Sequence, residues 1–219
     1  MRVMVAGATG LVGRALLSQL AADTQVSDIT ALVRRVPTGS AALPARVRAL
    51  TVDFSRLGQP LPAVDWAFCC LGTTIKVAGS QAAFQAVDQH AVLAFARAAR
   101  AAGARGLAVV SALGADAQSS VFYNRIKGQT EAELRQMDWP SLVIARPSLL
   151  MGNRAELGQA TRPMEQLAQR ITPAIGWLLP GRWRPIEGAT VARALRAAAA
   201  QGAPGVQVLE SETLARLGR

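Results

Sequence analysis

The stretch "RVMVAGATGLVGRALL", residues 2–17, indicates how the chain folds. Its first five residues form a short apolar run that ends at Gly7, as a buried strand does before a turn. Beyond the turn, apolar residues recur at Leu11, Ala15 and Leu16, which is helical spacing. The stretch therefore predicts a strand, a glycine turn and a helix, the first part of a β-α-β unit.

Three glycines, Gly7, Gly10 and Gly13, follow the predicted strand at three-residue spacing. Glycine permits a tight turn, close approach of a pyrophosphate to the backbone, and close packing of the helix on the strand. The N-terminus of the helix offers free N–H groups and a partial positive charge to phosphates. Between a strand and a helix this pattern predicts a dinucleotide-binding turn, although a plain tight turn carries similar glycines.

The alternation of strands and helices continues along the chain. Further strands are predicted near residues 28–34, 47–53, 64–72, 106–114 and 141–147, with long helices near 80–103 and 119–137. After an irregular segment come a helix at 188–202, a short strand at 206–209 and a terminal helix opened by Ser211. We therefore predict one doubly wound α/β domain over residues 1–219. Its parallel sheet carries helices on both faces, and residues 151–187 form a small substrate-side cap.

Composition limits the environment of the protein. No apolar run approaches the roughly 20 residues that cross a bilayer, so we expect no membrane partner. The early glycines leave no room for the apolar part of a signal peptide, which favours a cytoplasmic location. Cys69 and Cys70 are adjacent, cannot readily bridge each other, and are typical of buried thiols in a reducing compartment.

The net charge of +10 raises the question of a nucleic-acid partner. The arginines are scattered along the chain with no run longer than two, and no aromatic residues alternate with them. A nucleic-acid surface usually gathers its basic and aromatic residues. We expect no nucleic-acid partner, and instead an arginine-rich surface that reserves some guanidinium groups for a phosphorylated ligand.

The second predicted strand ends in "LVRR", with Arg34 and Arg35 where NAD-binding folds usually carry a carboxylate. Two guanidinium groups can pair with a 2′-phosphate, so we predict NADP(H) rather than NAD. A solvated arginine pair is the alternative. Asp53 closes the third strand and is placed to accept a hydrogen bond from the adenine amino group, while the turn at 70–74 is placed to run beside the adenosine and ribose.

The stretch "VFYNRIKGQTEAEL", residues 121–134, holds the only tyrosine and one of two lysines, four positions apart. Tyr123 and Lys127 share a helix face, and a nearby ammonium group favours the phenolate, which makes the pair a proton donor. Ser111 ends a predicted strand twelve residues earlier, and its hydroxyl can stabilise a carbonyl oxygen as hydride arrives. Taken one by one, these residues also suit a capping serine, a core tyrosine and a solvated lysine.

In this order and spacing, these features resemble the short-chain dehydrogenase/reductase superfamily over essentially the whole chain. More narrowly, "FCCLGTT", "VSALGADAQSSVFYNRIKGQTEAEL" and "ARPSLLMGNR" are similar to the atypical branch related to the human Tat-interacting protein. The resemblance implies a Rossmann fold and a catalytic set of Ser111, Tyr123 and Lys127. With Asp53 added, the predicted cofactor contacts are Gly7, Ala8, Thr9, Gly10, Leu11, Val12, Gly13, Arg34, Arg35, Asp53, Leu71, Gly72, Thr73, Tyr123, Lys127, Arg146, Pro147 and Ser148.

One position departs from that superfamily pattern. Many members carry an asparagine where this chain has Asp88, so the sequence leaves open whether Asp88 or His90 takes part in a proton relay. His90 is the only histidine and has no second ligand nearby, so we expect no metal. The predicted function is an NADP(H)-dependent oxidoreductase acting on a small carbonyl, alcohol or activated double bond. The alternative is a non-catalytic NADP(H)-binding regulator or redox sensor, and the resemblance also allows a homodimer.

Overall fold

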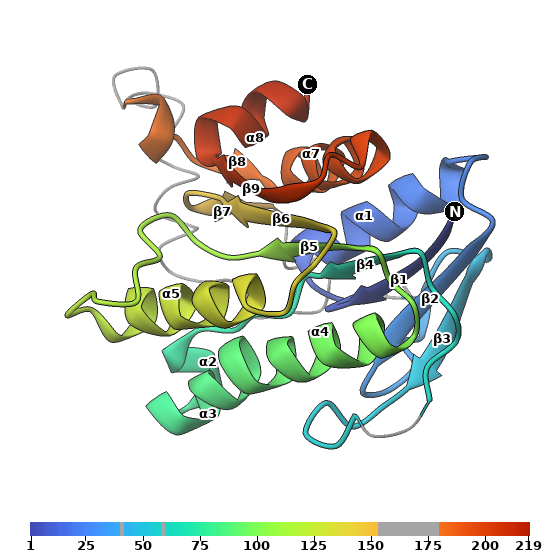
Figure 1. Ribbon diagram of the computed structural model, residues 1–219, viewed down its shortest axis with the longest axis horizontal. Coiled ribbons are helices and arrows are strands. Elements are labelled where there is room, and N and C mark those ends of the chain that lie inside the picture. Colours follow the sequence, from blue (N-terminus) through green and yellow to red (C-terminus); the bar gives the residue numbers. More distant parts are fainter. Residues whose placement is uncertain (40–41, 58–59, 153–179) are drawn as a thin grey trace.

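The computed structural model describes residues 1–39, 42–57, 60–152 and 180–219. Seven strands form one sheet in the order β3-β2-β1-β4-β5-β6-β9, and every pair of neighbours is parallel (Figure 1). The strands are β1 (Arg2–Ala6), β2 (Asp28–Val33), β3 (Val47–Thr51), β4 (Trp66–Cys69), β5 (Gly106–Val110), β6 (Ser141–Arg146) and β9 (Gly205–Glu210). The prediction of a doubly wound α/β fold is confirmed.

Helices cover both faces of this sheet (Figure 1). One face carries α1 (Leu11–Ala22), α7 (Gly188–Gln201) and α8 (Ser211–Leu217). The other carries α2 (Ile75–Ala78), α3 (Gln81–Gln85), α4 (Val92–Ala101) and α5 (Phe122–Arg135). Parallel sheets need this double cover because both of their faces are apolar.

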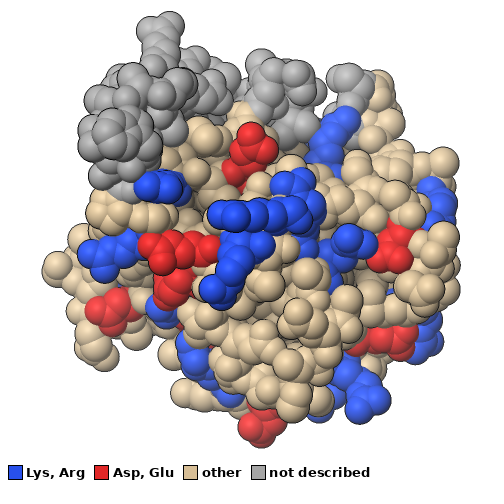
Figure 2. Space-filling model, turned by 90° about the horizontal axis from the view of Figure 1, so that it is seen from above, with Lys and Arg blue, Asp and Glu red and all other residues tan. Residues whose placement is uncertain are grey.

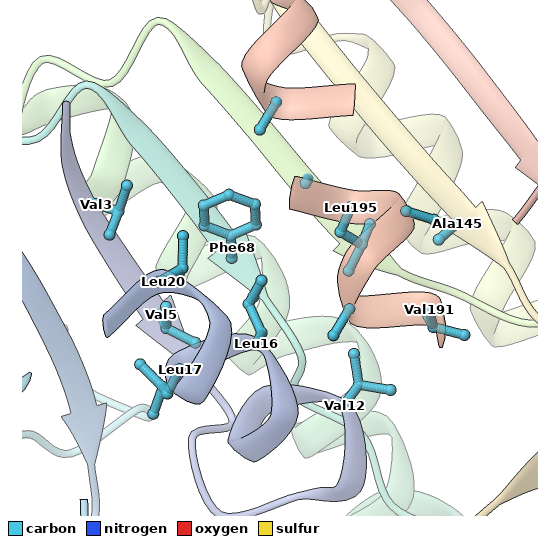
Figure 3. Packing of buried hydrophobic residues seen from close by; sticks show 14 of the residues in the cluster. Val3, Val5, Val12, Leu16, Leu17, Leu20, Phe68, Ala145, Val191 and Leu195 are labelled. Carbon is cyan, nitrogen blue, oxygen red and sulfur yellow. The ribbon is translucent and has the colours of Figure 1, made fainter. Parts of the chain in front are cut away.

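Strand β1 shows how the core is divided. Val3 and Val5 point toward α1 and α7, where they pack with Leu16 and Phe68 (Figure 3). Met4 lies in the second cluster, beneath the helices of the opposite face. Successive strand residues point to opposite faces, so a strand buried on both sides has a continuous apolar sequence. Each fully buried side chain of this kind stabilises the fold by about 1.5–3 kcal/mol.

The helix predicted near 80–103 is interrupted. Ser80 caps its start as expected, since its Oγ accepts the Ala83 N–H at 3.1 Å. Between α3 and α4, however, a π-helical turn runs over Ala86–Ala91. Such turns insert an extra residue, re-aim side chains and are frequent at functional sites. This one carries Asp88, whose backbone oxygen accepts a hydrogen bond from Thr130 Oγ1 at 3.2 Å.

The prediction that the terminal helix opens at Ser211 is confirmed. Glu210 is the N-cap of α8, and Ser211 is the first helical residue. The Ser211 hydroxyl donates to Ser148 Oγ at 3.0 Å. This bond joins the start of α8 to the segment that follows β6.

Most of the predicted cap, residues 153–179, lies outside the described residues. At its two ends, β7 (Leu150–Met151) pairs with β8 (Ile186–Glu187), and a 3₁₀ turn runs over Gly181–Trp183. The two ends therefore meet beside the carboxyl end of β6. The assignment of a single domain with a cap stays a prediction.

Basic and acidic side chains share the face above α7 and α8. Figure 2 shows basic side chains gathered near its centre with carboxylates beside them. Arg196 of α7, for example, places Nη1 2.9 Å from Asp23 Oδ2. Some of the positive charge on this face is thus paired within the protein, and the absence of a nucleic-acid partner stays a prediction.

No helix in the described ranges is long and apolar enough to cross a bilayer. Cys69 and Cys70 were predicted to be buried thiols, and both are free; Cys69 is buried and Cys70 is partly buried. Cys69 is fully buried, and this burial raises the pKa of its thiol to about 12. An unreactive, protonated thiol suits a structural role in the core.

Candidate cofactor and catalytic site

The glycine turn packs tightly against the end of β4. Gly7 has a φ of +81°, and a Cβ there would lie 2.3 Å from the Cys70 carbonyl oxygen. A Cβ on Gly13 would lie 2.1 Å from the Gly7 oxygen. No side chain fits at either position, so these two glycines are required by the fold itself.

Gly10 differs from its two neighbours in the motif. Among the described residues, a Cβ on Gly10 would meet only the Gly7 oxygen, at an ordinary 3.5 Å. Its φ of −79° is also open to any residue. Protein packing therefore does not require glycine here. Free space beside the backbone at the start of α1 is what a pyrophosphate needs, and it fits a dinucleotide.

The turn lies where the strand order of the sheet reverses, between β1 and β4. Ligands of doubly wound folds bind in the crevice at this point, outside the carboxyl ends of the strands. Gly10, the N-cap of α1, contributes no capping side chain. The first N–H groups of α1 therefore receive no capping bond from the side chain of the N-cap, and they offer partial positive charge to an anion.

Arg34 and Arg35 follow β2 at the same edge of the sheet. Both are exposed, and neither side chain forms an ion pair with the residues that the structure describes. The Val52 N–H donates to the Val33 oxygen at 2.9 Å, which sets Asp53 beside this pair. Asp53 is exposed, and its Oδ1 accepts hydrogen bonds from Ser55 Oγ at 2.7 Å and Ser55 N at 2.9 Å. The arginines are thus available to a ligand, whereas Asp53 is partly used by its own turn.

Asp88 joins the predicted cofactor turn to Lys127. Its Oδ2 accepts the Thr73 N–H at 2.8 Å, and its Oδ1 lies 2.7 Å from Lys127 Nζ. Asp88 and Lys127 are only 1% and 5% exposed. Burial lowers the pKa of Lys127, but the attraction of Asp88 and Tyr123 outweighs it, so that pKa stays above its ordinary value. Lys127 is therefore held as a cation, and Asp88 is its ion-pair partner.

Tyr123 lies in the first turn of α5 and is half-buried. Its ring centroid is 5.4 Å from that of Phe84 on α3, which fixes the ring against the opposite wall. Tyr123, Lys127 and Glu131 follow one another at four-residue intervals and share one face of α5. The sequence-based prediction included the first two residues of this series and missed the third.

Ser111 follows β5 and turns its hydroxyl toward that third residue. Ser111 Oγ donates to Glu131 Oε1 at 2.5 Å, and both side chains are buried. The hydroxyl does not lie free to donate to a carbonyl oxygen, so this part of the sequence-based expectation differs from the structure. The sequence contained a signal for this partner of Ser111, because Glu131 lies four residues after Lys127 and therefore shares its helix face.

Arg146, at the end of β6, holds Glu131 from the other side. Its Nε lies 3.0 Å from Oε1 and its Nη2 2.6 Å from Oε2, a two-pronged pairing. Its Nη1 also donates to Glu210 Oε1 at 3.2 Å. The hydrogen bond to Glu131, above all, raises the pKa of Arg146. The guanidinium expected beside the nicotinamide is thus committed to two carboxylates.

Pro147 and Ser148 connect the end of β6 to its surroundings. The Pro147 carbonyl accepts the Leu113 N–H at 2.9 Å. Ser148 Oγ donates to the Arg184 carbonyl oxygen and accepts a hydrogen bond from Ser211. Both residues have structural partners, and their contact with a nicotinamide stays a prediction.

This sheet order, with a glycine turn at the reversal point, defines a dinucleotide-binding protein of the Rossmann type. A family model described as NAD(P)H-binding matches residues 7–171, and the chain belongs to that family. Within it the chain is a member of the atypical short-chain dehydrogenase/reductase branch, which confirms the resemblance seen in the motifs.

Several known proteins are similar to this chain. Protein HTATIP2 of Rattus norvegicus is 33% identical over 224 residues, which cover 99% of this chain and 89% of that protein. Protein FMP52, mitochondrial, of Eremothecium gossypii is 38% identical, with 70% and 68% covered. MoeE5 in complex with UDP-glucose and NAD has a TM-score of 0.71 at 17% identity, with 95% and 75% covered. UDP-glucose 4-epimerase from Thermotoga maritima reaches 0.73 at 14%, with 96% and 77% covered. The two solved structures show the fold alone.

Proposed function

We propose that this protein is an NADP(H)-dependent oxidoreductase of the short-chain dehydrogenase/reductase type. Its substrate is a small carbonyl or alcohol, or an activated double bond. The observation that carries the proposal is the buried Lys127–Asp88 pair, one helical turn from Tyr123 and hydrogen-bonded to the turn at Thr73. Hydride transfer to or from a carbonyl carbon requires a group beside the cofactor that gives or takes a proton. Tyr123 is that group in this proposal, and Lys127 assists it.

The residues of the crevice fit the cofactor. The space beside Gly10 and the N-terminus of α1 receive the pyrophosphate. Arg34 and Arg35, which form no ion pair with any described residue, receive the 2′-phosphate. When bound, the cofactor supplies or accepts hydride at its nicotinamide. NADP(H) is proposed over NAD(H) because two cations occupy the position where a carboxylate would bind the ribose hydroxyls.

The proton is moved by this chain's own side chains. Tyr123 gives its phenolic proton to the substrate oxygen, or takes one from it, and Lys127 stabilises the phenolate that forms. Asp88 keeps Lys127 in place and charged. General acid–base catalysis of this kind contributes about 10²–10⁴-fold to a rate.

The test is steady oxidation of NADPH by the purified protein with a panel of aldehydes, ketones and quinones. Turnover with any of them, lost in a Tyr123→Phe variant, supports the proposal. A protein that binds NADPH tightly but oxidises it with none of them contradicts the catalytic part.

A second candidate is a non-catalytic NADP(H)-binding regulator. One observation favours it: the Ser111 hydroxyl is turned to Glu131 and is not free beside Tyr123. In that case cofactor binding changes a surface that another protein recognises. Capture of the same partner only in the presence of NADPH, together with no turnover, distinguishes this candidate from the enzyme.

Location and assembly remain open predictions of this proposal. A cytoplasmic location is expected from the sequence, whereas the fungal relatives are named mitochondrial. Fractionation of cells that express the full chain decides between the two compartments. Light scattering of the purified chain tests for the homodimer.

A further inference from the structure

A cleft open to solvent lies between α1 and α7, which cover the same face of the sheet (Figure 1). Its volume is about 390 Å³, toward the lower end of the range for small-molecule sites. The residues that line it are Gln19, Ala22, Asp23, Thr24, Arg193 and Arg196. They belong to the C-terminal end of α1, and 12 helical residues separate that end from the glycine turn by about 18 Å. The cleft is therefore distinct from the crevice proposed for the dinucleotide.

Two arginines of α7 form the basic wall of this cleft. Arg193 and Arg196 lie three positions apart and so share one face of the helix. Arg193 Nε donates to the Gly218 carbonyl oxygen, and its Nη2 donates to Thr190 Oγ1 at 3.1 Å. Arg196 Nη1 lies 2.9 Å from Asp23 Oδ2. The protein thus holds both guanidinium groups in place, which lowers the entropy cost of binding a ligand between them.

Each arginine keeps one nitrogen for a ligand. Within the described ranges, neither Arg193 Nη1 nor Arg196 Nη2 has a hydrogen-bond partner, and the Arg196 side chain is 41% exposed. Two further polar atoms of the cleft, Gln19 Oε1 and Arg196 Nε, are buried and also lack a partner among these residues. Unpaired buried polar atoms cost free energy, so a ligand toward which these side chains turn recovers that cost.

The charge of the cleft favours an anion. Two guanidinium groups face one carboxylate, that of Asp23, so one positive charge is in excess. The C-terminal end of α1 carries partial negative charge, which would repel an anion. Arg46 offsets it, because its Nη1 donates to the carbonyl oxygens of Ala21 at 2.7 Å and Asp23 at 3.2 Å.

We infer that this cleft binds the phosphate group of a small molecule. Guanidinium groups match phosphate in charge and in the geometry of their donors, and Arg193 Nη1 and Arg196 Nη2 are the donors offered here. The exposed Thr24 supplies a further hydroxyl at the rim. A phosphate monoester and free phosphate share this chemistry, and the experiment below separates them. The inference does not depend on the proposed function.

Nuclear magnetic resonance of the full chain shows where an anion binds, because each signal belongs to one residue. Inorganic phosphate and glycerol 3-phosphate are titrated separately at constant ionic strength, with sodium chloride as the blank. We expect saturable shifts of the Arg193 and Arg196 Nε–H signals, the Gln19 side-chain amide and the Thr24 backbone amide. Tighter binding of glycerol 3-phosphate identifies an ester as the ligand, and tighter binding of inorganic phosphate identifies the free ion.

Arg193→Gln removes one cation of the cleft. Loss of a charge-assisted hydrogen bond should weaken phosphate binding about tenfold or more. Arg216→Gln is the matched control, because Arg216 is an exposed arginine of α8 that does not line the cleft. It changes the net charge of the protein equally, and its affinity for phosphate should remain close to that of the wild type.

Asp23→Asn tests the cleft in the opposite direction. The variant removes the one carboxylate and releases Arg196 Nη1 for the ligand, while its amide oxygen can still accept the Gln25 N–H. Phosphate should bind more tightly, a gain that a destabilised protein does not produce. This variant keeps the inference testable if Arg193→Gln does not fold.

Any of four results overturns the inference. The first is a set of shifts no larger than those in sodium chloride, and the second is shifts confined to the glycine turn with Arg34 and Arg35. The third is an equal loss of affinity in Arg193→Gln and Arg216→Gln, and the fourth is no gain in Asp23→Asn. Failure of the proposed function shows separately, as absent NADPH binding or turnover, and leaves the shifts in the cleft unchanged.

Discussion

Lys127 Nζ and Asp88 Oδ1 lie 2.7 Å apart in a pair that is almost completely buried, and the second oxygen of Asp88 holds the Thr73 N–H. One carboxylate thus connects α5 to the turn predicted to contact the cofactor. The stability of the fold and the geometry of the site therefore both depend on the side chain of Asp88.

Asp88→Ala removes the partner of a buried cation. Breaking a buried ion pair in this way typically costs 3–5 kcal/mol, because the remaining charge is uncompensated. We expect a loss of about that size in the free energy of unfolding, measured by urea denaturation. In Asp88→Ala with Lys127→Met most of the loss should be recovered. The control is Asp65→Ala, which breaks the exposed pair with Arg2 and should cost much less. Equal losses in the two single variants contradict the prediction.

Gly10 and Gly13 should respond to alanine in opposite ways. Gly13→Ala places a Cβ 2.1 Å from the Gly7 oxygen, so it should unfold or strongly destabilise the protein. Gly10→Ala meets nothing closer than 3.5 Å among the described residues, so the melting temperature should change little. It should nevertheless weaken NADPH binding, because the new methyl group fills the space of the pyrophosphate. Fluorescence titration checks this, and unchanged affinity in Gly10→Ala excludes the assigned binding position.

Arg34→Ala combined with Arg35→Ala should remove a preference for NADPH over NADH. Charge-assisted hydrogen bonds contribute about 1.5–3 kcal/mol each, so losing one or both lowers NADPH affinity roughly 10- to 100-fold or more. NADH affinity should change little, and calorimetry measures both. Arg97→Ala, an exposed arginine of α4, is the control. Equal affinities of the unaltered protein for the two cofactors would refute the assignment of NADP(H).

Much of this architecture could be predicted from the sequence because it depends on local patterns. Short apolar runs marked the strands, and the glycine turn between the first strand and helix indicated a dinucleotide-binding turn. The hydrogen bond between Ser111 and Glu131 could not be predicted in the same way, because it joins a strand end to a helix through packing of the whole domain. The π-helical turn that aims Asp88 was also missed, since an alanine-rich segment gives no sign of one extra residue.

Acid should weaken the fold partly through Asp65. Hydrogen bonds from the Arg2 side chain and backbone lower the pKa of Asp65 from 3.8 to about 2. A carboxyl group with a depressed pKa stabilises the folded state above its unfolded pKa and loses that effect as pH falls through the folded value. The contribution should therefore disappear between about pH 4 and pH 2. Thermal melts of Asp65→Asn should show a smaller dependence on pH in that window, and identical slopes argue against the assignment.

Tyr123→Phe isolates the proton transfer from cofactor binding. The variant keeps the ring that packs 5.4 Å from Phe84, so the fold and the NADPH affinity should remain close to those of the wild type. It lacks the hydroxyl that gives or takes the proton, and turnover of any substrate found should fall about 10²–10⁴-fold. Phe122→Leu is the control, because Phe122 also packs on Phe84, at 5.8 Å, but carries no proton. Full activity in Tyr123→Phe would exclude the tyrosine as the proton donor, whereas lost NADPH binding would assign it to the cofactor site instead.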